Sequence, residues 1–318
     1  MPTPRDSRLS VLHRRALRVG APVRTAAVLS AGLFACAAPQ VGRSPEALAS
    51  FSFGAIADCQ YCSVVGEGVR KYSMSDAKLA RCVEHLNQLE LEHVVHLGDF
   101  IDRDFQSFAA VGPIFERLEA PGYHVLGNHD YSVADERKQD VVAALGMPSR
   151  FHAFTSGGWR FIVLDGNDIS IQSSSEGSPE RRAAEAMLEA TAGSRPWNGA
   201  LGAEQLDWLA GALAAAEAAG EDVVLYCHFP VLPLDPGHNL WNAAEVVELI
   251  EAFPNVRAYI NGHNHAGAYE LHNGVHYVTL KGMVDTDETS YAVVTVHRDR
   301  LELEGFGREG DRVLLIER

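Results

Sequence analysis

The chain has 318 residues and a formal net charge of −15, and 47% of its residues are hydrophobic. This length and this apolar share suit one elaborated globular domain with a sizeable core. The excess of acid disfavours nucleic acid or an anionic membrane surface as a partner, because phosphate backbones are bound by clustered Lys and Arg. An anionic small molecule would need a local source of positive charge, and a bound metal ion is the usual one.

The first 38 residues differ from the remainder. They hold six arginines and one acid, and an apolar run that ends in small residues follows Arg24. The run is too short for a mature membrane span but suits the core of a signal peptide. "LFAC" before the end of this segment is similar to a bacterial lipoprotein cleavage box, and ordinary signal cleavage also fits.

We therefore expect residues 1–38 to direct export to the cell envelope or periplasm, with a lipid anchor at Cys36 as the only membrane contact. A mis-assigned start, a disordered tail and a cytoplasmic location are the alternatives. Cys59 and Cys62 form a lone CxxC. A zinc ribbon needs a second pair and a thioredoxin motif needs a helix start, so we predict small buried side chains here rather than a redox or zinc site.

From residue 51 onward, short apolar runs alternate with helical stretches, which is typical of an α/β domain. We predict strands at 51–58, 92–99, 122–130, 222–230 and 256–263. We predict helices at 73–90, 108–119, 134–146, 203–220 and 242–253.

Three further segments complete the pattern. Residues 151–165 read as a hairpin whose turn is set by Gly157 and Gly158. Residues 166–202 read as an inserted loop around one helix, and antiparallel strands are expected from residue 267 onward.

Each of the five predicted strands outside the hairpin ends in polar residues. These residues are Asp58, Gln60, Asp99, Asn128, His129, His228, His263 and His265. Loops beyond the carboxyl ends of strands converge on the ligand site of α/β sheets. Each motif alone is weak, because "GD" and "GNHD" also favour turns and a histidine after a strand is often a core residue. The ordered series of five predicts a site.

The series D-x-Q, GD, GNH, H, GHxH resembles the calcineurin-like metallophosphoesterases, from about residue 51 to about residue 306. The usual first motif of that superfamily is D-x-H. The glutamine here, with "LDGNDIS", "PWNGALG" and "NLWN", is similar to one branch, the manganese-dependent ADP-ribose/CDP-alcohol diphosphatases. The resemblance implies a metallophosphoesterase sandwich of two mixed β-sheets flanked by helices, as a single domain over 51–306 with a C-terminal tail at 307–318.

The resemblance also implies two divalent metal ions. One would be held by Asp58, Gln60, Asp99 and His265, and the other by Asp99, Asn128, His228 and His263. An amide oxygen in place of an imidazole moves the preference of the first ion from zinc toward manganese or magnesium, so Mn²⁺ is expected, with Mg²⁺, Fe or Zn as alternatives. The alternative role for Gln60 is only a hydrogen bond to a neighbouring loop, in which case one metal ion is not bound.

Two ions would make the site locally positive inside an acidic protein, which suits a phosphate ester or a diphosphate. A water activated by the ions is the expected nucleophile, and His129 is expected to protonate or stabilise the leaving oxygen. The alternative is that His129 is a structural residue held by Asp102 or Asp130.

We expect a monomeric hydrolase that cleaves the diphosphate of small nucleoside diphosphate conjugates such as ADP-ribose and CDP-alcohols. A cyclic-nucleotide or other phosphodiesterase is the alternative within the superfamily, and a non-catalytic nucleotide-binding envelope protein is the alternative outside it. Tyr61, Phe100 and Trp241 could stack a base but are more often core residues. Arg103 could contact a phosphate or pair with a neighbouring aspartate.

Overall fold

The computed structural model describes residues 50–317 of the chain. The signal-like segment 1–38 and the expected anchor at Cys36 lie outside these residues, so export, cleavage and lipidation stay predictions. Among residues 50–317, no helix is both long enough and apolar enough to cross a membrane. All of the described residues belong to one compact unit of the chain.

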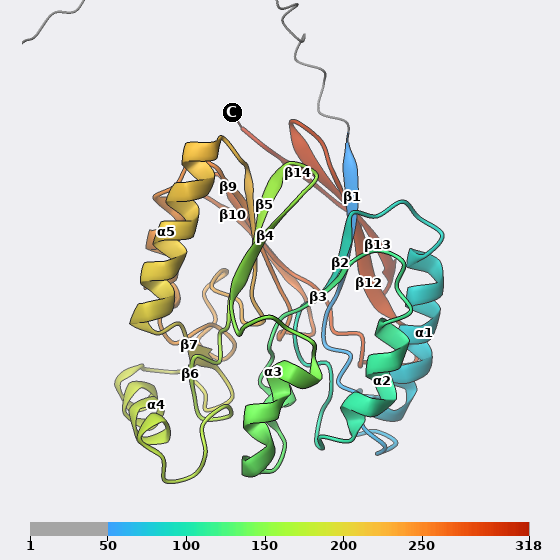
Figure 1. Cartoon of the computed structure of the whole chain (residues 1–318), viewed down its shortest axis with the longest axis vertical. Helices are drawn as coiled ribbons and strands as arrows, with labels where there is room; N and C mark the ends of the chain where they lie inside the picture. Colours follow the sequence, from blue (N-terminus) through green and yellow to red (C-terminus); the bar gives the residue numbers. More distant parts are fainter. Residues whose placement is uncertain (1–49, 318) are drawn as a thin grey trace, which may run out of the picture. The chain divides into compact units, whose positions relative to one another are not determined.

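The first of two six-stranded sheets is mixed (Figure 1). Its strands, in spatial order, are β14 (Arg312–Leu315), β13 (Arg300–Gly307), β12 (Ser290–Val296), β1 (Phe51–Ile56), β2 (His93–His96) and β3 (Gly122–His124). The strands β1, β2 and β3 run parallel, whereas β12, β13 and β14 continue the sheet in antiparallel pairs.

The second sheet is also mixed. Its strands, in spatial order, are β10 (Ala268–His272), β11 (Val275–Thr279), β9 (Val256–Asn261), β8 (Val223–Tyr226), β5 (Trp159–Val163) and β4 (His152–Ser156). The predicted hairpin is β4–β5, and its turn residues Gly157 and Gly158 have φ of 56° and 79°, the left-handed backbone that such a turn requires. The predicted sandwich of two mixed sheets is confirmed.

Helices cover the outer faces of the two sheets (Figure 1). Along the first sheet lie α1 (Ser75–Leu86) and α2 (Ser107–Phe115). The second sheet is covered by α5 (Ala203–Ala219) and α6 (Ala243–Glu251), which contact each other. At the end toward which β1 runs lie α3 (Val141–Ala144), α4 (Pro179–Ala190), β6 (Ile169–Ser170) and β7 (Gly199–Ala200).

Aromatic side chains fill the space between the two sheets. His93 on β2 stacks on Phe53 with ring centroids 5.0 Å apart and hydrogen-bonds the Tyr226 hydroxyl of the other sheet at 3.0 Å. Burial lowers the pKa of His93 to about 3, so the ring is neutral in this layer. This packing fixes β1 and β2 against β8, and with them the loops at their carboxyl ends.

Two predicted segments differ from the structure in kind, and the strand predicted at 122–130 is shorter, Gly122–His124. The helix predicted at 134–146 is a 3₁₀ helix, Asp135–Asp140, followed by the short α3. Its six residues include no apolar side chain and none is buried, so there is no face that could pack a longer α-helix. The segment 307–318, expected as a tail, contributes β14, which pairs with β13 and forms an edge of the first sheet.

A buried lysine ties α1 to the loop between β11 and β12. The side chain of Lys78 is fully buried, and its Nζ donates hydrogen bonds to the carbonyl oxygens of Met283 and Thr286. Burial lowers the pKa of this lysine to about 8. The loop that it holds carries Asp285, whose role is described below.

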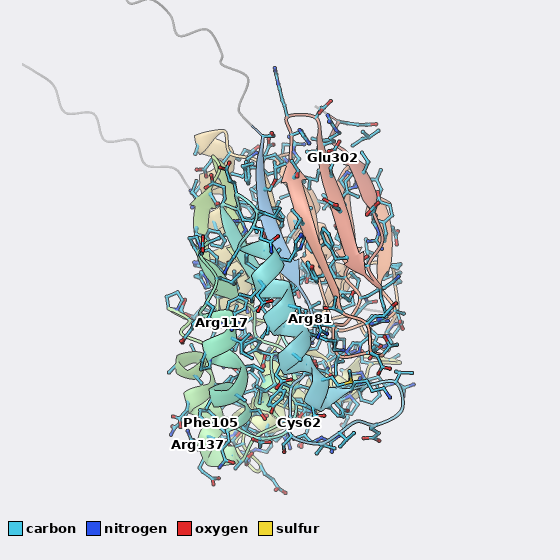
Figure 2. All side chains as sticks on the ribbon, turned by 90° about the vertical axis from the view of Figure 1, so that its right-hand side faces the viewer. Cys62, Arg81, Phe105, Arg117, Arg137 and Glu302 are labelled. Carbon is cyan, nitrogen blue, oxygen red and sulfur yellow. The ribbon has the colours of Figure 1, made fainter. Side chains whose placement is uncertain are left out.

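Replacing Lys78 with methionine should lower the free energy of unfolding by about 1–3 kcal/mol, because the carbonyl oxygens lose their donor while the apolar stem is kept. Chemical denaturation monitored by circular dichroism measures the change. Arg81→Met, an exposed cation on the same helix (Figure 2), is the matched control and should change stability by less than about 0.5 kcal/mol. Equal effects of the two variants would contradict the assignment.

Candidate metal centre

Five strands from both sheets end beside one another, and the loops after them carry all of the predicted site residues. In Figure 1 this is the end at which α3, α4, β6 and β7 lie. After β1, β2, β3, β8 and β9 come, in that order, Asp58 and Gln60, Asp99, Asn128 and His129, His228, and His263 and His265. Each of these eight residues lies within contact distance of one or more of the others.

Four of these side chains form one group of donor atoms. The Nε2 atom of His228 lies 3.2 Å from Asn128 Oδ1, 3.3 Å from Asp99 Oδ2 and 3.1 Å from His263 Nδ1. One ligand atom from each of Asp99, His228 and His263 lies within 4.8 Å of the other two. A carboxylate, an amide oxygen and two imidazole nitrogens that converge in this way suit a divalent transition metal.

The second group shares the same aspartate. The Nε2 atom of His265 lies 3.4 Å from Asp58 Oδ1 and 3.3 Å from Gln60 Nε2. Gln60 Nε2 in turn lies 2.9 Å from Asp99 Oδ2, the atom that also faces His228. The two groups are the two ligand sets predicted above, joined at one carboxylate oxygen. Their role as ligands stays a prediction, whereas their convergence is observed.

Backbone strain is concentrated at these residues. Among residues 50–317, six non-glycine residues have a positive φ, and four of them are Asp58 (52°), Gln60 (44°), Asp99 (56°) and His263 (70°). The left-handed region costs a non-glycine residue on the order of 1–3 kcal/mol. The fold therefore holds these four side chains in place at the expense of stability, which is typical of functional sites.

The kink at His263 also separates the two histidines of "GHNH". Because His263 leaves the extended conformation, its ring faces His228 while the ring of His265 faces Asp58. Each ring thereby joins a different donor group.

Each imidazole is oriented by a hydrogen bond from its other nitrogen. His228 Nδ1 donates to the Leu97 carbonyl at 2.9 Å, His263 Nε2 to Asn198 Oδ1 at 2.9 Å and His265 Nδ1 to Asp285 Oδ1 at 2.9 Å. Each bond fixes which nitrogen faces the site, so that the opposite nitrogen is the one that binds a metal once it is unprotonated. Asn198 and Asp285 were not singled out from the sequence, although "PWNGALG" contains the first.

The glycines of two motifs are required by close backbone approach. A Cβ on Gly127, in "GNH", would lie 2.1 Å from the backbone nitrogen of Asp99. A Cβ on Gly98, in "GD", would lie 2.6 Å from Nδ1 of His228, and its φ is +94°. Any larger residue at either position would displace a predicted ligand.

The charges of the site are unbalanced without a cation. Burial acts to lower the pKa of His228, but the charges of Asp99 and Asp58 raise it to about 9. The pKa of His265 is likewise raised to about 9, against burial, by Asp58 and Asp285. In the absence of metal the carboxylates thus retain protons on neighbouring imidazoles, and a bound cation displaces such protons.

The Gln60 amide gives the most direct test of fit to a metal. Its Oε1 atom is buried and has no hydrogen-bond partner, while Nε2 faces Asp99 and His265. A half-turn of the amide exchanges oxygen and nitrogen with almost no change of shape. The amide oxygen would then face a carboxylate oxygen and an imidazole nitrogen. All three atoms can donate an electron pair, so one cation can bind them together. The amide bonds only to predicted ligands and not to a neighbouring loop, so the residues present fit a metal ion.

His129 lies beside the two groups and is held by a carboxylate. Its Nδ1 lies 2.5 Å from Asp102 Oδ1, and its backbone N–H donates to Asp99 Oδ1 at 2.7 Å. Burial acts against the charged ring, but Asp99 and Asp102 raise the pKa of His129. Asp130, the other partner considered, instead accepts hydrogen bonds from the backbone N–H groups of Gly127, Asp99 and Phe100.

A cavity of about 390 Å³ opens over these residues. It is lined by Gln60, Arg70, Asp99, Asn128, His129, Ser132, Gln172, Trp197, His238, His263 and His265. Arg70 and Trp197 were not found from the sequence, because both lie in irregular loops without periodic pattern. The Trp197 side chain is 43% exposed, and its indole N–H donates to the Gly237 carbonyl at 3.0 Å, which fixes the plane of the ring.

The other candidates are structural. Phe100 and Trp241 are buried, and Tyr61 packs against the core, so none of the three faces the cavity. Arg103 pairs with Asp102 at 2.6 Å and with Glu67 at 3.3 Å. The two cysteines of the CxxC, Cys59 and Cys62, are free and buried, as predicted.

The fold and the site together define a metal-dependent phosphoesterase, and comparison with known proteins gives the same result. The chain belongs to the calcineurin-like phosphoesterase family, whose model matches residues 51–267. It is accordingly a metal-dependent hydrolase of phosphoric esters or anhydrides.

Curated relatives and a solved structure show which members of the family the chain is similar to. The chain is 31% identical over 297 residues to the manganese-dependent ADP-ribose/CDP-alcohol diphosphatase of Arabidopsis thaliana, covering 81% of this chain and 94% of the relative. The human protein of the same name is 30% identical over 328 residues, covering 85% and 96%. A dimetal phosphatase from Danio rerio shares the fold, with a TM-score of 0.76, 24% identity and coverage of 84% of this chain and 99% of that one.

Proposed function

We propose that the protein is a manganese-dependent diphosphatase that cleaves the diphosphate bond of nucleoside diphosphate conjugates, ADP-ribose and CDP-alcohols among them. The observation that carries the proposal is the Gln60 amide among carboxylate and imidazole donors, with its oxygen buried and unpartnered. A neutral amide oxygen in place of imidazole favours Mn²⁺ or Mg²⁺ over Zn²⁺. Relatives at about 30% identity carry this metal and these substrates in their names.

The two donor groups would hold the ions. Asp58, Gln60, Asp99 and His265 would hold one, and Asp99, Asn128, His228 and His263 the other. When bound, the ions supply positive charge that stabilises the phosphoryl oxygens in the transition state and acidifies water.

His129 would move the proton that the leaving group needs. Its Nδ1 is engaged by Asp102, which leaves Nε2 for the cavity. A proton on Nε2 can pass to the oxygen of the departing nucleoside monophosphate or alcohol phosphate as the phosphorus–oxygen bond breaks. Asp102 stabilises the protonated ring and fixes its orientation throughout.

The rim of the cavity supports a nucleoside substrate. Trp197 offers a large, half-exposed aromatic face whose orientation is fixed by the Gly237 carbonyl. A nucleobase stacked on such a face gains on the order of 1–3 kcal/mol. The net charge of −15 disfavours long polyanions, so a small nucleotide conjugate suits the site better than a nucleic acid.

A substrate panel tests the proposal. The full-length protein with Mn²⁺ should release AMP from ADP-ribose and CMP from CDP-choline, measured by chromatography of the products. A higher kcat/KM on 3′,5′-cyclic AMP would favour a cyclic-nucleotide phosphodiesterase. Tight retention of ADP-ribose without product would indicate a binding protein. No turnover of any diphosphate with Mn²⁺ would refute the proposed activity.

Replacing Gln60 with histidine should shift the metal preference away from Mn²⁺, because imidazole is a softer donor than an amide oxygen. We expect the ratio of bound zinc to bound manganese to rise about tenfold after equilibration with both ions. Inductively coupled plasma mass spectrometry measures this ratio independently of activity. Gln172→His, a cavity-lining change outside the two donor groups, is the control. An unchanged ratio in Gln60→His would contradict the account of the amide.

A further inference from the structure

One cation of the cavity belongs to neither donor group. Arg70 lines the cavity together with Gln60, Asp99 and the two histidines of "GHNH". It lies on the loop between β1 and α1 and is half-buried. The guanidinium therefore faces the same space as the predicted metal ligands, from a segment to which no role has been assigned.

The backbone of Arg70 is fixed on both sides. Its N–H donates to the Glu67 carbonyl at 3.0 Å, and its own carbonyl accepts from the Glu67 N–H at 3.0 Å. A β-bridge pairs Arg70 with Asp285, the residue that orients His265, and the N–H of Lys71 donates to the Val284 carbonyl at 2.8 Å. The position of Arg70 is thus tied to that of the donor group around His265.

The side chain lies next to a buried tyrosine. Interaction with Tyr72 favours the charged form of the Arg70 guanidinium, and the Tyr72 ring also lies under the Arg103 guanidinium at 5.0 Å. Burial acts to lower the pKa of Arg70, but Tyr72 and the more distant charges of Asp99 and Asp58 raise it, so the group stays charged.

The charge of Arg70 has no counter-ion at contact distance. Among residues 50–317, no carboxylate oxygen lies within 4.0 Å of its guanidinium nitrogens, whereas the neighbouring Arg103 has Asp102 at 2.6 Å. A half-buried guanidinium without a carboxylate is a ready anion site, and its planar fork matches two phosphoryl oxygens. Once Asp58 and Asp99 are neutralised by metal, the charge of Arg70 is still shared with Asp285, but that carboxylate already pairs with His265 at 2.9 Å and lies 3.7 Å from Arg308. A phosphoryl group of the substrate can therefore take up the charge of Arg70.

We propose that Arg70 binds the second, non-reacting phosphoryl group of a diphosphate substrate, and so favours diphosphates over esters with a single phosphoryl group. The proposal rests on the diphosphatase function proposed above. A lone phosphoryl group can place all of its charge at the donor groups and leaves Arg70 unpaired. A diphosphate carries a second charged phosphoryl group, which extends beyond the two donor groups.

The test compares two substrates that share a nucleoside. One is ADP-ribose, and the other is the 4-nitrophenyl ester of adenosine 5′-monophosphate, which has one phosphoryl group. For Arg70→Gln we expect kcat/KM to fall roughly 10- to 100-fold on ADP-ribose and less than about threefold on the ester. Arg70→Lys, which keeps the charge, should recover part of the loss. Arg81→Gln, an exposed cation on the outer face of α1 (Figure 2), should change neither rate.

The possible outcomes separate this proposal from the function on which it rests. Equal losses on both substrates, or a fall in bound manganese in Arg70→Gln, would overturn it in favour of a structural role. Unchanged hydrolysis of ADP-ribose would also overturn it while leaving the diphosphatase function intact. Wild-type protein that cleaves the ester but no diphosphate would instead refute the function.

Discussion

Replacing Asp99 with asparagine should lower kcat/KM on ADP-ribose by about 10³-fold or more and reduce bound manganese from two ions per chain to less than one. Asp99 is the residue that contacts both donor groups, since its Oδ2 atom lies 2.9 Å from Gln60 Nε2 and 3.3 Å from His228 Nε2. An amide of the same shape removes the negative charge that two adjacent cations require. The loss of several kcal/mol of transition-state stabilisation corresponds to the expected factor.

Two measurements check this expectation independently. Metal analysis of the dialysed protein reports loading without reference to turnover, and steady-state kinetics on ADP-ribose reports the rate. Asp140→Asn, at a half-exposed carboxylate paired with Arg137, is the matched control and should leave both unchanged. A variant of Asp99 that still held two ions per chain would show that this carboxylate does not join the two groups.

The predicted metal ligands could be found from the sequence because each follows an apolar run. A buried strand is visible as a run of apolar residues, and the polar residue after it lies at the carboxyl edge of the sheet. Asp58, Asp99 and His228 follow β1, β2 and β8 within three residues, so the pattern along the chain translates directly into position in space.

The residues that orient the ligands could not be found in this way. Asn198 lies 65 residues before His263 in an inserted segment, and Asp285 lies 20 residues after His265 in a loop. Neither position follows a strand or belongs to an amphipathic helix, so no local pattern marks it. Arg70 was missed for the same reason. Long-range contacts within irregular loops depend on the packing of the whole fold.

The helix predicted at 134–146 shows a related limit. Charged residues favour helix formation locally, but an α-helix in a globular protein is stabilised mainly by an apolar face. Residues 135–140 lack such a face, and the segment adopts the tighter 3₁₀ form. The two glycines of the β4–β5 turn could be predicted because turn type depends on backbone conformation at the residues themselves.

Replacing His129 with alanine should lower kcat on ADP-ribose about 10²- to 10³-fold and leave the content of bound manganese unchanged. The imidazole is held by Asp102 through Nδ1 and presents Nε2 to the cavity, which is the arrangement of a proton donor. The loss should be at least about tenfold larger on the phenyl ester of adenosine 5′-monophosphate than on its 4-nitrophenyl ester, because phenolate is the stronger base and needs the proton more. Asp102→Asn, which keeps the shape but not the charge, should show the same dependence on the leaving group in weaker form.

The dependence on the leaving group distinguishes proton transfer from a structural role. If His129 only supported the loop that carries Asn128, its removal would reduce the rates on both esters equally and would release metal. His272→Ala, at an exposed histidine that ends β10 and pairs with Glu251, controls for the loss of a histidine as such and should change neither rate. Equal losses on the phenyl and 4-nitrophenyl esters would therefore rule out His129 as the acid, whereas a larger loss on the phenyl ester with intact metal content would support proton transfer.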